Sequence, residues 1–223
     1  IVEQLGEPTE SEWSLEIDAG DAQTVNFHYP TALPTAEYEG MAYITPRVKF
    51  ELGARGDPWP TEEKVIRPYA ADDYPDFFTD PDTSVTVLSA RRTFWEKATA
   101  IHVFCLQERL RGDRFARHWH DVVRLDEAGF AEAAFADRDL ANAVARHKSM
   151  FFAEKAADHT PIDYAAAVSG GLQLVPVGDG AKALEDDYAR MVEDGLLFDD
   201  EEPFEALMAR CADIAARTNR AAK

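Results

Sequence analysis

The chain has 223 residues, a formal net charge of −19 from 42 acidic and 23 basic side chains, and 46% hydrophobic residues. This length and apolar content suit one compact domain or two small domains that share a core. A protein with this negative charge repels the phosphate backbone of nucleic acid, which excludes general DNA or RNA binding. A local basic pocket can still hold a nucleotide or a tRNA end. No apolar run approaches the ~20 residues of a membrane span, and the N-terminus has no signal-peptide pattern, so we expect a cytoplasmic protein.

The first ninety residues alternate between apolar and polar side chains, as half-buried strands do. Strands are expected at 14–18, 24–29, 43–54 and 84–88. The first two flank a turn at 19–21 and predict a β-hairpin. The segment 56–81 is rich in proline and aspartate, so it predicts a long loop with one short strand around 64–67.

After Ser89 the apolar spacing changes from two to about three and a half, which predicts helices. They are expected from Phe94 to Gly112 and at 115–125, 132–152, 181–194 and 203–220. Their apolar positions include Phe94, Ala98, Ile101 and Cys105 in the first helix and Phe135, Leu140, Val144 and Phe151 in the third. The fold class is therefore α+β, with strands in a domain at 1–90 and helices in a domain at 91–223 packed on it. Cys105 and Cys211 lie in helical apolar stripes, so two reduced core thiols are favoured over a disulfide.

Polar residues interrupt these patterns at two places that could carry chemistry. On the third strand, Lys49, Glu51 and Arg55 face away from the apolar side chains, which suits either a site or a half-exposed strand with cross-strand ion pairs. In the first helix, Lys97 precedes the core position Ala98. Its ammonium either reaches out to water over apolar neighbours or faces a phosphate.

The second helix carries a further candidate pair. Arg117 and Asp121 are four residues apart and share a face, which an ordinary intrahelical ion pair explains equally well. His118 and His120 point in different directions on a helix, which disfavours a metal site. The acidic loop lacks the glycine and glutamate of an EF-hand, so a solvated loop is favoured over a calcium site. Its aspartates are Asp72, Asp73, Asp76, Asp80 and Asp82.

Four segments, taken in order, resemble the nucleotidyltransferase toxins of the bacterial AbiEii/AbiGii family, which belong to type IV toxin–antitoxin and abortive-infection systems. They are Val-Lys-Phe-Glu-Leu-Gly-Ala-Arg at 48–55, Thr-Phe-Trp-Glu-Lys-Ala at 93–98, Arg-His-Trp-His-Asp-Val at 117–122 and Arg-His-Lys-Ser-Met-Phe-Phe at 146–152. The resemblance covers roughly residues 40–155 and rests on order and spacing. It implies a nucleotidyltransferase-like partial β-sheet followed by a helical bundle.

The resemblance also implies roles for individual residues. Lys97 and Asp121 match the helical lysine and aspartate that complete the nucleotide pocket, and we expect them to be catalytic and to converge beside Glu51 at the rim of the sheet. The other expected substrate-binding residues are Glu51, Lys49, Arg55 and Arg117. The upstream Gly-Gly-Thr-Ser and Ser-Glu-Asp-Ile-Asp stretches of the family are absent from this sequence. The chain is therefore expected to be the C-terminal part of such a toxin, without metal ligands and inactive alone.

In an intact protein of this type, we expect Mg²⁺ and a nucleoside triphosphate as cofactor and substrate, and the 3′ end of tRNA or another cellular target as the acceptor. A cognate antitoxin is an expected partner. Two alternatives remain open. One is a non-catalytic module whose acidic surface binds an antitoxin or another basic partner. The other is a phosphotransferase on the same scaffold, which would share Lys97 and Asp121.

Overall fold

A computed structural model describes residues 13–31, 34, 45–53, 55–108, 114–197 and 201–222. Contacts divide the chain into two units, one of residues up to Gly56 together with Ala189–Glu201, and the other of Asp57–Tyr188 together with Glu202 and the residues after it. The division predicted at residue 90 marks the change from strands to helices. Whether it is also a domain boundary stays a prediction.

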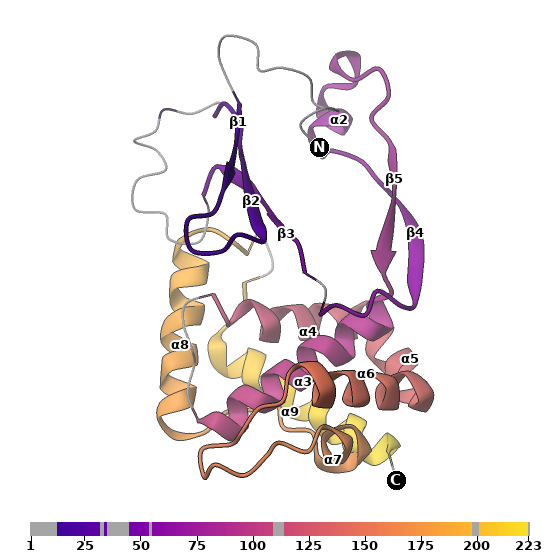
Figure 1. Ribbon diagram of the computed structural model, residues 1–223, viewed down its shortest axis with the longest axis vertical. Coiled ribbons are helices and arrows are strands. Elements are labelled where there is room, and N and C mark those ends of the chain that lie inside the picture. The colour runs from indigo at the N-terminus through magenta and orange to yellow at the C-terminus, as the bar shows by residue number, and fades with distance from the viewer. Residues whose placement is uncertain are drawn as a thin grey trace. The chain divides into compact units, whose positions relative to one another are not determined.

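The first unit contains a small antiparallel sheet of β1 (Ser14–Ile17), β2 (Thr24–His28) and β3 (Arg47–Glu51), in the order β1-β2-β3 (Figure 1). Leu15 pairs with Phe27, and Val25 pairs with Phe50. The Asp18 carboxylate accepts hydrogen bonds from the Gly20 backbone N–H and the Asn26 side chain, at 3.0 and 3.2 Å, and so fixes the turn. The predicted hairpin is confirmed, and the described part of the third strand is shorter than predicted.

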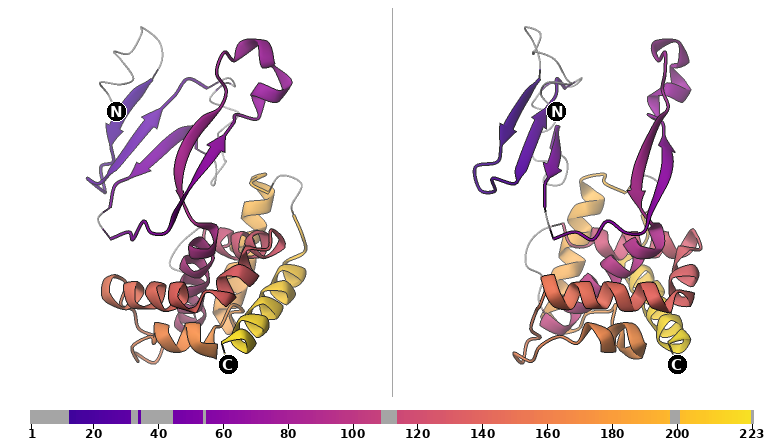
Figure 2. Two further views of the ribbon diagram at one scale, coloured as in Figure 1. Left: turned by 90° about the vertical axis from the view of Figure 1, so that its right-hand side faces the viewer. Right: turned by 45° about the vertical axis from the view of Figure 1, so that its right-hand side comes forward.

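The second unit begins with a hairpin of β4 (Thr61–Ile66) and β5 (Thr83–Leu88), which pair along their whole length. Short helices α2 (Ala70–Asp73) and η2 (Pro75–Phe77) lie between them, where a loop was expected. Arg67 holds this connection through ion pairs to Asp72 at 2.8 Å and Asp82 at 3.0 Å. Figure 2 shows β5 running directly into the first long helix.

Helices make up the rest of the second unit, and the last part of α8 belongs to the first unit. Their bounds are α3 (Ala90–Gln107), α4 (Arg117–Glu127), α5 (Phe130–Ala136), α6 (Arg138–Phe151), α7 (Tyr164–Ala166), η3 (Ala167–Gly171), α8 (Gly178–Glu193) and α9 (Phe204–Ala221). The central helix is α3, which packs on α4, α5 and α6 (Figure 1). Its predicted apolar face is confirmed, because Phe94, Ala98, Ile101 and Cys105 are all buried. Buried Trp95 donates its indole N–H to the Ala134 carbonyl of α5 at 3.1 Å, which fastens the two helices together.

The single helix predicted at 132–152 is wrong, because the chain breaks at Asp137 into α5 and α6. Asp137 has non-helical backbone angles, and its carboxylate accepts a hydrogen bond from the Leu140 backbone N–H at 3.1 Å, which starts a new helix. Phe151, predicted on the apolar stripe, is 48% exposed in the last turn of α6.

Both cysteines are free and buried, as predicted. Burial raises the pKa of Cys105 and Cys211 to about 12, so neither is a reactive thiolate at neutral pH. Across the described residues, no helix is both long and apolar enough to cross a membrane.

Candidate functional site

The structure brings Lys97 and Asp121 together. Lys97 lies in the first half of α3 and Asp121 in the first half of α4, and these helices pack against each other. The Lys97 Nζ and Asp121 Oδ2 atoms are 2.5 Å apart, and the side chains are 26% and 39% exposed. Asp121 therefore pairs across two helices and not with Arg117 along α4, so the intrahelical ion pair is not the arrangement that forms.

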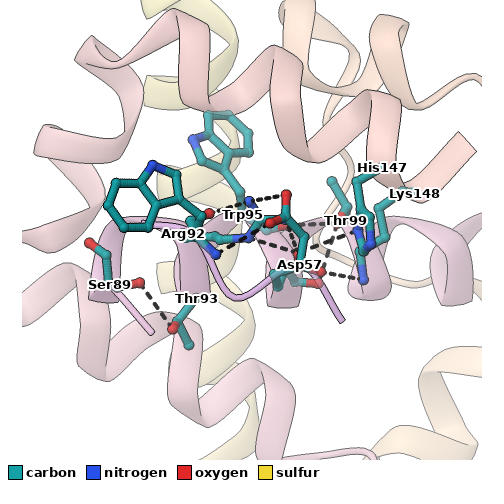
Figure 3. A network of polar contacts seen from close by, with 10 residues as sticks. Asp57, Ser89, Arg92, Thr93, Trp95, Thr99, His147 and Lys148 are labelled. Carbon is teal, nitrogen blue, oxygen red and sulfur yellow. Dashed lines mark hydrogen bonds and ion pairs between the residues drawn. The ribbon is translucent and has the colours of Figure 1, made fainter. Parts of the chain in front are cut away.

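A second polar network lies on the next face of α3, around the buried side chain of Arg92 (Figure 3). Its guanidinium contacts Glu96 Oε1 at 3.1 Å, Asp57 Oδ2 at 2.9 Å and the Trp59 carbonyl at 2.5 Å. Only 1% of the Arg92 side chain is exposed. Every partner is thus an oxygen that compensates the lost hydration of the charge.

Glu96 connects this network to α6. Its Oε2 atom lies 2.6 Å from Lys148 Nζ, and both side chains are mostly buried, at 22% and 13% exposed. Figure 3 shows Lys148 and His147 approaching α3 from α6. The Lys148 ammonium also lies 4.8 Å from the centre of the Phe152 ring. Three of the segments that carry the family resemblance therefore meet around α3: 93–98, 117–122 and 146–152.

His118 is part of the same surroundings. Burial lowers its pKa to about 4, and the positive charges of Lys97 and Arg117 add to this, so the imidazole is neutral at pH 7. Its Nδ1 atom is buried and has no hydrogen-bond partner among the residues that the structure describes. The ring lies 6.2 Å from Phe104 and 6.0 Å from Phe115.

The remaining predicted site residues fall into two groups. Arg117 lies on α4, with Asp121, in the second unit. Lys49 and Glu51 form an ion pair of 2.7 Å along β3 in the first unit, where Arg55 also lies. This pair joins residues of one strand, so it is not the cross-strand pair considered above. The convergence of Glu51 with Lys97 and Asp121 stays a prediction.

Sequence reasoning missed Arg92, Glu96 and Lys148. The Arg92–Glu96 spacing of four residues was visible, but such a pair is usually exposed on a helix. Lys148 lies in segment 146–152, which resembles the family, but no sequence pattern indicates that it pairs with Glu96 of a distant helix.

Metal binding has little support in the described ranges. No group of three or more His, Cys, Asp or Glu side chains there could hold a metal ion. The single carboxylate of Asp121, already paired with an ammonium, does not match the oxygen-rich set that Mg²⁺ requires. The described residues therefore provide no set of side chains that fits Mg²⁺.

The chain is thus an α+β protein with a partly exposed lysine–carboxylate pair at the contact between two helices. The family comparison makes this specific. The family model described as nucleotidyl transferase AbiEii toxin, type IV TA system, matches residues 2–210. The chain belongs to this family. Neither the curated proteins nor the solved structures give a significant match.

Proposed function

We propose that this chain, as part of the intact protein expected from the family resemblance, takes part in transfer of a nucleotidyl group from a nucleoside triphosphate to an acceptor hydroxyl, that of the 3′ end of tRNA or of another acceptor. The observation that supports this most is the 2.5 Å pair of Lys97 and Asp121. These are the two residues for which the resemblance of segments 93–98 and 117–122 implies a catalytic role. Both side chains are partly exposed, so a ligand can reach them.

In the proposed reaction, the acceptor hydroxyl oxygen forms a bond to the α-phosphorus of the triphosphate. The bond from that phosphorus to the bridging oxygen breaks, pyrophosphate leaves, and the hydroxyl proton is taken up by a base. Lys97 is a compact donor that would neutralise phosphate charge. Asp121 would orient Lys97 or accept the proton, since a carboxylate next to the phosphate is well placed for either task.

The test measures incorporation of label from α-labelled triphosphates into a tRNA pool. Lys97→Ala is expected to lose ~100-fold or more of the rate, which is the typical effect of removing one charge-stabilising donor. Lys64→Ala is a matched control, because Lys64 forms a similar ion pair with Glu62 at 3.0 Å on the β4–β5 hairpin. Labelling by Lys97→Ala at the parent rate would contradict the proposal. The mass added to the acceptor separates nucleotidyl from phosphoryl transfer.

We further propose that a cognate antitoxin binds this protein. The family consists of toxins of type IV toxin–antitoxin systems, and the net charge of −19 favours a partner with a basic surface. Co-purification of the two proteins, weakened by raised salt, is the expected result. Binding that is independent of salt would argue against a charge-driven contact.

A further inference from the structure

A small aromatic pocket lies within the second unit, and α3, the helix that carries Lys97, forms part of its wall. Its volume is about 230 Å³. Four aromatic side chains line part of it, and a lysine and a glutamate add polar groups. These residues are Phe104, Phe115, Phe152, Tyr164, Lys148 and Glu154, and three smaller residues of α3 complete the wall. The volume of the pocket is smaller than the roughly 300–1,000 Å³ of a typical ligand site, so the pocket suits one flat group of a larger ligand.

The pocket lies on the Glu96 side of α3, and its edge borders the face of Lys97. Thr99 and Val103 follow Glu96 by three and seven residues, whereas Ala100 and Phe104 follow Lys97 by the same spacing, so these two residues form the edge nearest to Lys97. At 1.5 Å per residue, Phe104 lies about 10 Å along the axis from Lys97. A ligand with its flat group in the pocket can therefore extend along α3 to the ammonium of Lys97.

The aromatic rings are held in defined positions. Phe104 and Phe115 meet edge to face, with centroids 4.5 Å apart. The Phe152 backbone carbonyl accepts a hydrogen bond from the Tyr164 hydroxyl at 2.7 Å. The Phe152 backbone N–H donates a hydrogen bond to the Lys148 carbonyl at 2.8 Å. These bonds fix the backbone of Phe152, while 36% of the residue remains exposed to an incoming ligand.

We infer that this aromatic pocket binds the base of the nucleoside triphosphate, with the phosphates directed along α3 to Lys97. The inference rests on the proposed function, because it assigns the second half of the same substrate. Flat rings offer a stacking surface for any base. Lys148 lines the pocket and pairs with Glu96, the residue next to Lys97. Lys148 thus places a cation at the pocket wall, paired with the residue that precedes Lys97 in α3.

The experiment compares two ligands by titration calorimetry on the whole protein: a nucleoside triphosphate and inorganic triphosphate, which has no base. Phe152→Ala is expected to weaken binding of the nucleoside triphosphate by about tenfold, or about 1.4 kcal/mol, and to leave inorganic triphosphate unchanged. Phe151→Ala is the matched control, because Phe151 is the neighbouring exposed phenylalanine and lies outside the pocket. It should bind both ligands as the parent does.

Ala100→Leu provides a second variant, since it narrows the pocket from α3 without removing a ring. It is expected to give the same selective loss. If both pocket variants bind the nucleoside triphosphate as the parent does, or lose both ligands equally, the base assignment is wrong. Lys97→Ala should weaken both ligands. If Lys97→Ala bound both ligands as the parent does, the proposed phosphate site would be wrong. The Phe152 and Ala100 variants would still test the pocket independently of that result.

Discussion

The role of the Lys97–Asp121 pair is best tested by measuring stability and activity on the same variants. Lys97→Met and Asp121→Asn, alone and combined, form a double-mutant cycle. The two side chains are 26% and 39% exposed, so water screens their attraction. Pairs of this exposure typically couple by about 0.2–1 kcal/mol. We therefore expect a coupling of less than about 1 kcal/mol in the free energy of unfolding, measured by urea titration.

Activity should respond quite differently. Each single substitution is expected to lower the transfer rate by ~100-fold or more, which corresponds to about 2.7 kcal/mol or more of transition-state stabilisation. The double variant should be little worse than the worse single variant, because groups that act as a unit are not additive. Labelling of tRNA and urea unfolding are measured on the same preparations.

The opposite pattern would refute this reasoning. A buried structural pair loses about 3–5 kcal/mol when one partner is removed. If Lys97→Met cost this much stability, and activity fell only in proportion to the unfolded fraction, the pair would be a structural tie between α3 and α4. Arg92→Met is a useful comparison, because the Arg92 side chain is only 1% exposed and should show the larger effect on stability.

Three other predictions concern the helices. Asp187, which is 1% exposed, accepts hydrogen bonds from two backbone N–H groups just before α4, at 2.9 and 2.8 Å, so Asp187→Ala should lower the free energy of unfolding by about 2–4 kcal/mol in urea titration. Burial lowers the pKa of His102 and His118 from 6.5 to about 4, so between these pH values the unfolded state binds more protons than the folded state. The free energy of unfolding should therefore fall as the pH drops from 6.5 to 4, by up to about 3 kcal/mol per histidine. His102→Gln should reduce this dependence of stability on pH, as measured by urea titrations at several pH values. Arg217 binds three carboxylates at 2.6–2.7 Å, so Arg217→Met should lower Tm, with a smaller difference at high salt.

The elements of this fold that could be predicted are those with a local pattern. The α3 stripe of Phe94, Ala98 and Ile101 repeats at helical spacing, and every member is buried as predicted. The first hairpin follows from alternation around a short turn in the same way. The meeting of Lys97 with Asp121 came from the family resemblance, because no local pattern specifies which residue of α4 faces α3.

Other features depend on contacts between distant segments, which a single sequence does not encode locally. Arg92 looks like half of an exposed helical ion pair, yet Asp57 and the Trp59 carbonyl contact it from more than thirty residues away in the chain. Asp187 looks like a surface residue of α8, yet it accepts hydrogen bonds from backbone groups at the start of α4. The break at Asp137 was missed because the alanine-rich segments on both sides continue the helical pattern. The feature that marks the break is the hydrogen bond by which Asp137 caps the start of α6.

Under the proposed function, the adjacency of Glu96 and Lys97 would let one helix position both ends of a substrate. Successive helical residues point about 100° apart, so Glu96 reaches Lys148 of α6 while Lys97 reaches Asp121 of α4. A shift of α6 against α3 would move Phe152 and Lys148, and with them the aromatic pocket, but would leave the Lys97–Asp121 distance unchanged. A shift of α4 would move Asp121 and Phe115, and so would change the pair and the pocket together. Contacts that fasten α4, such as those of Asp187, should therefore affect both base binding and transfer, whereas substitutions on α6 should act on base binding first.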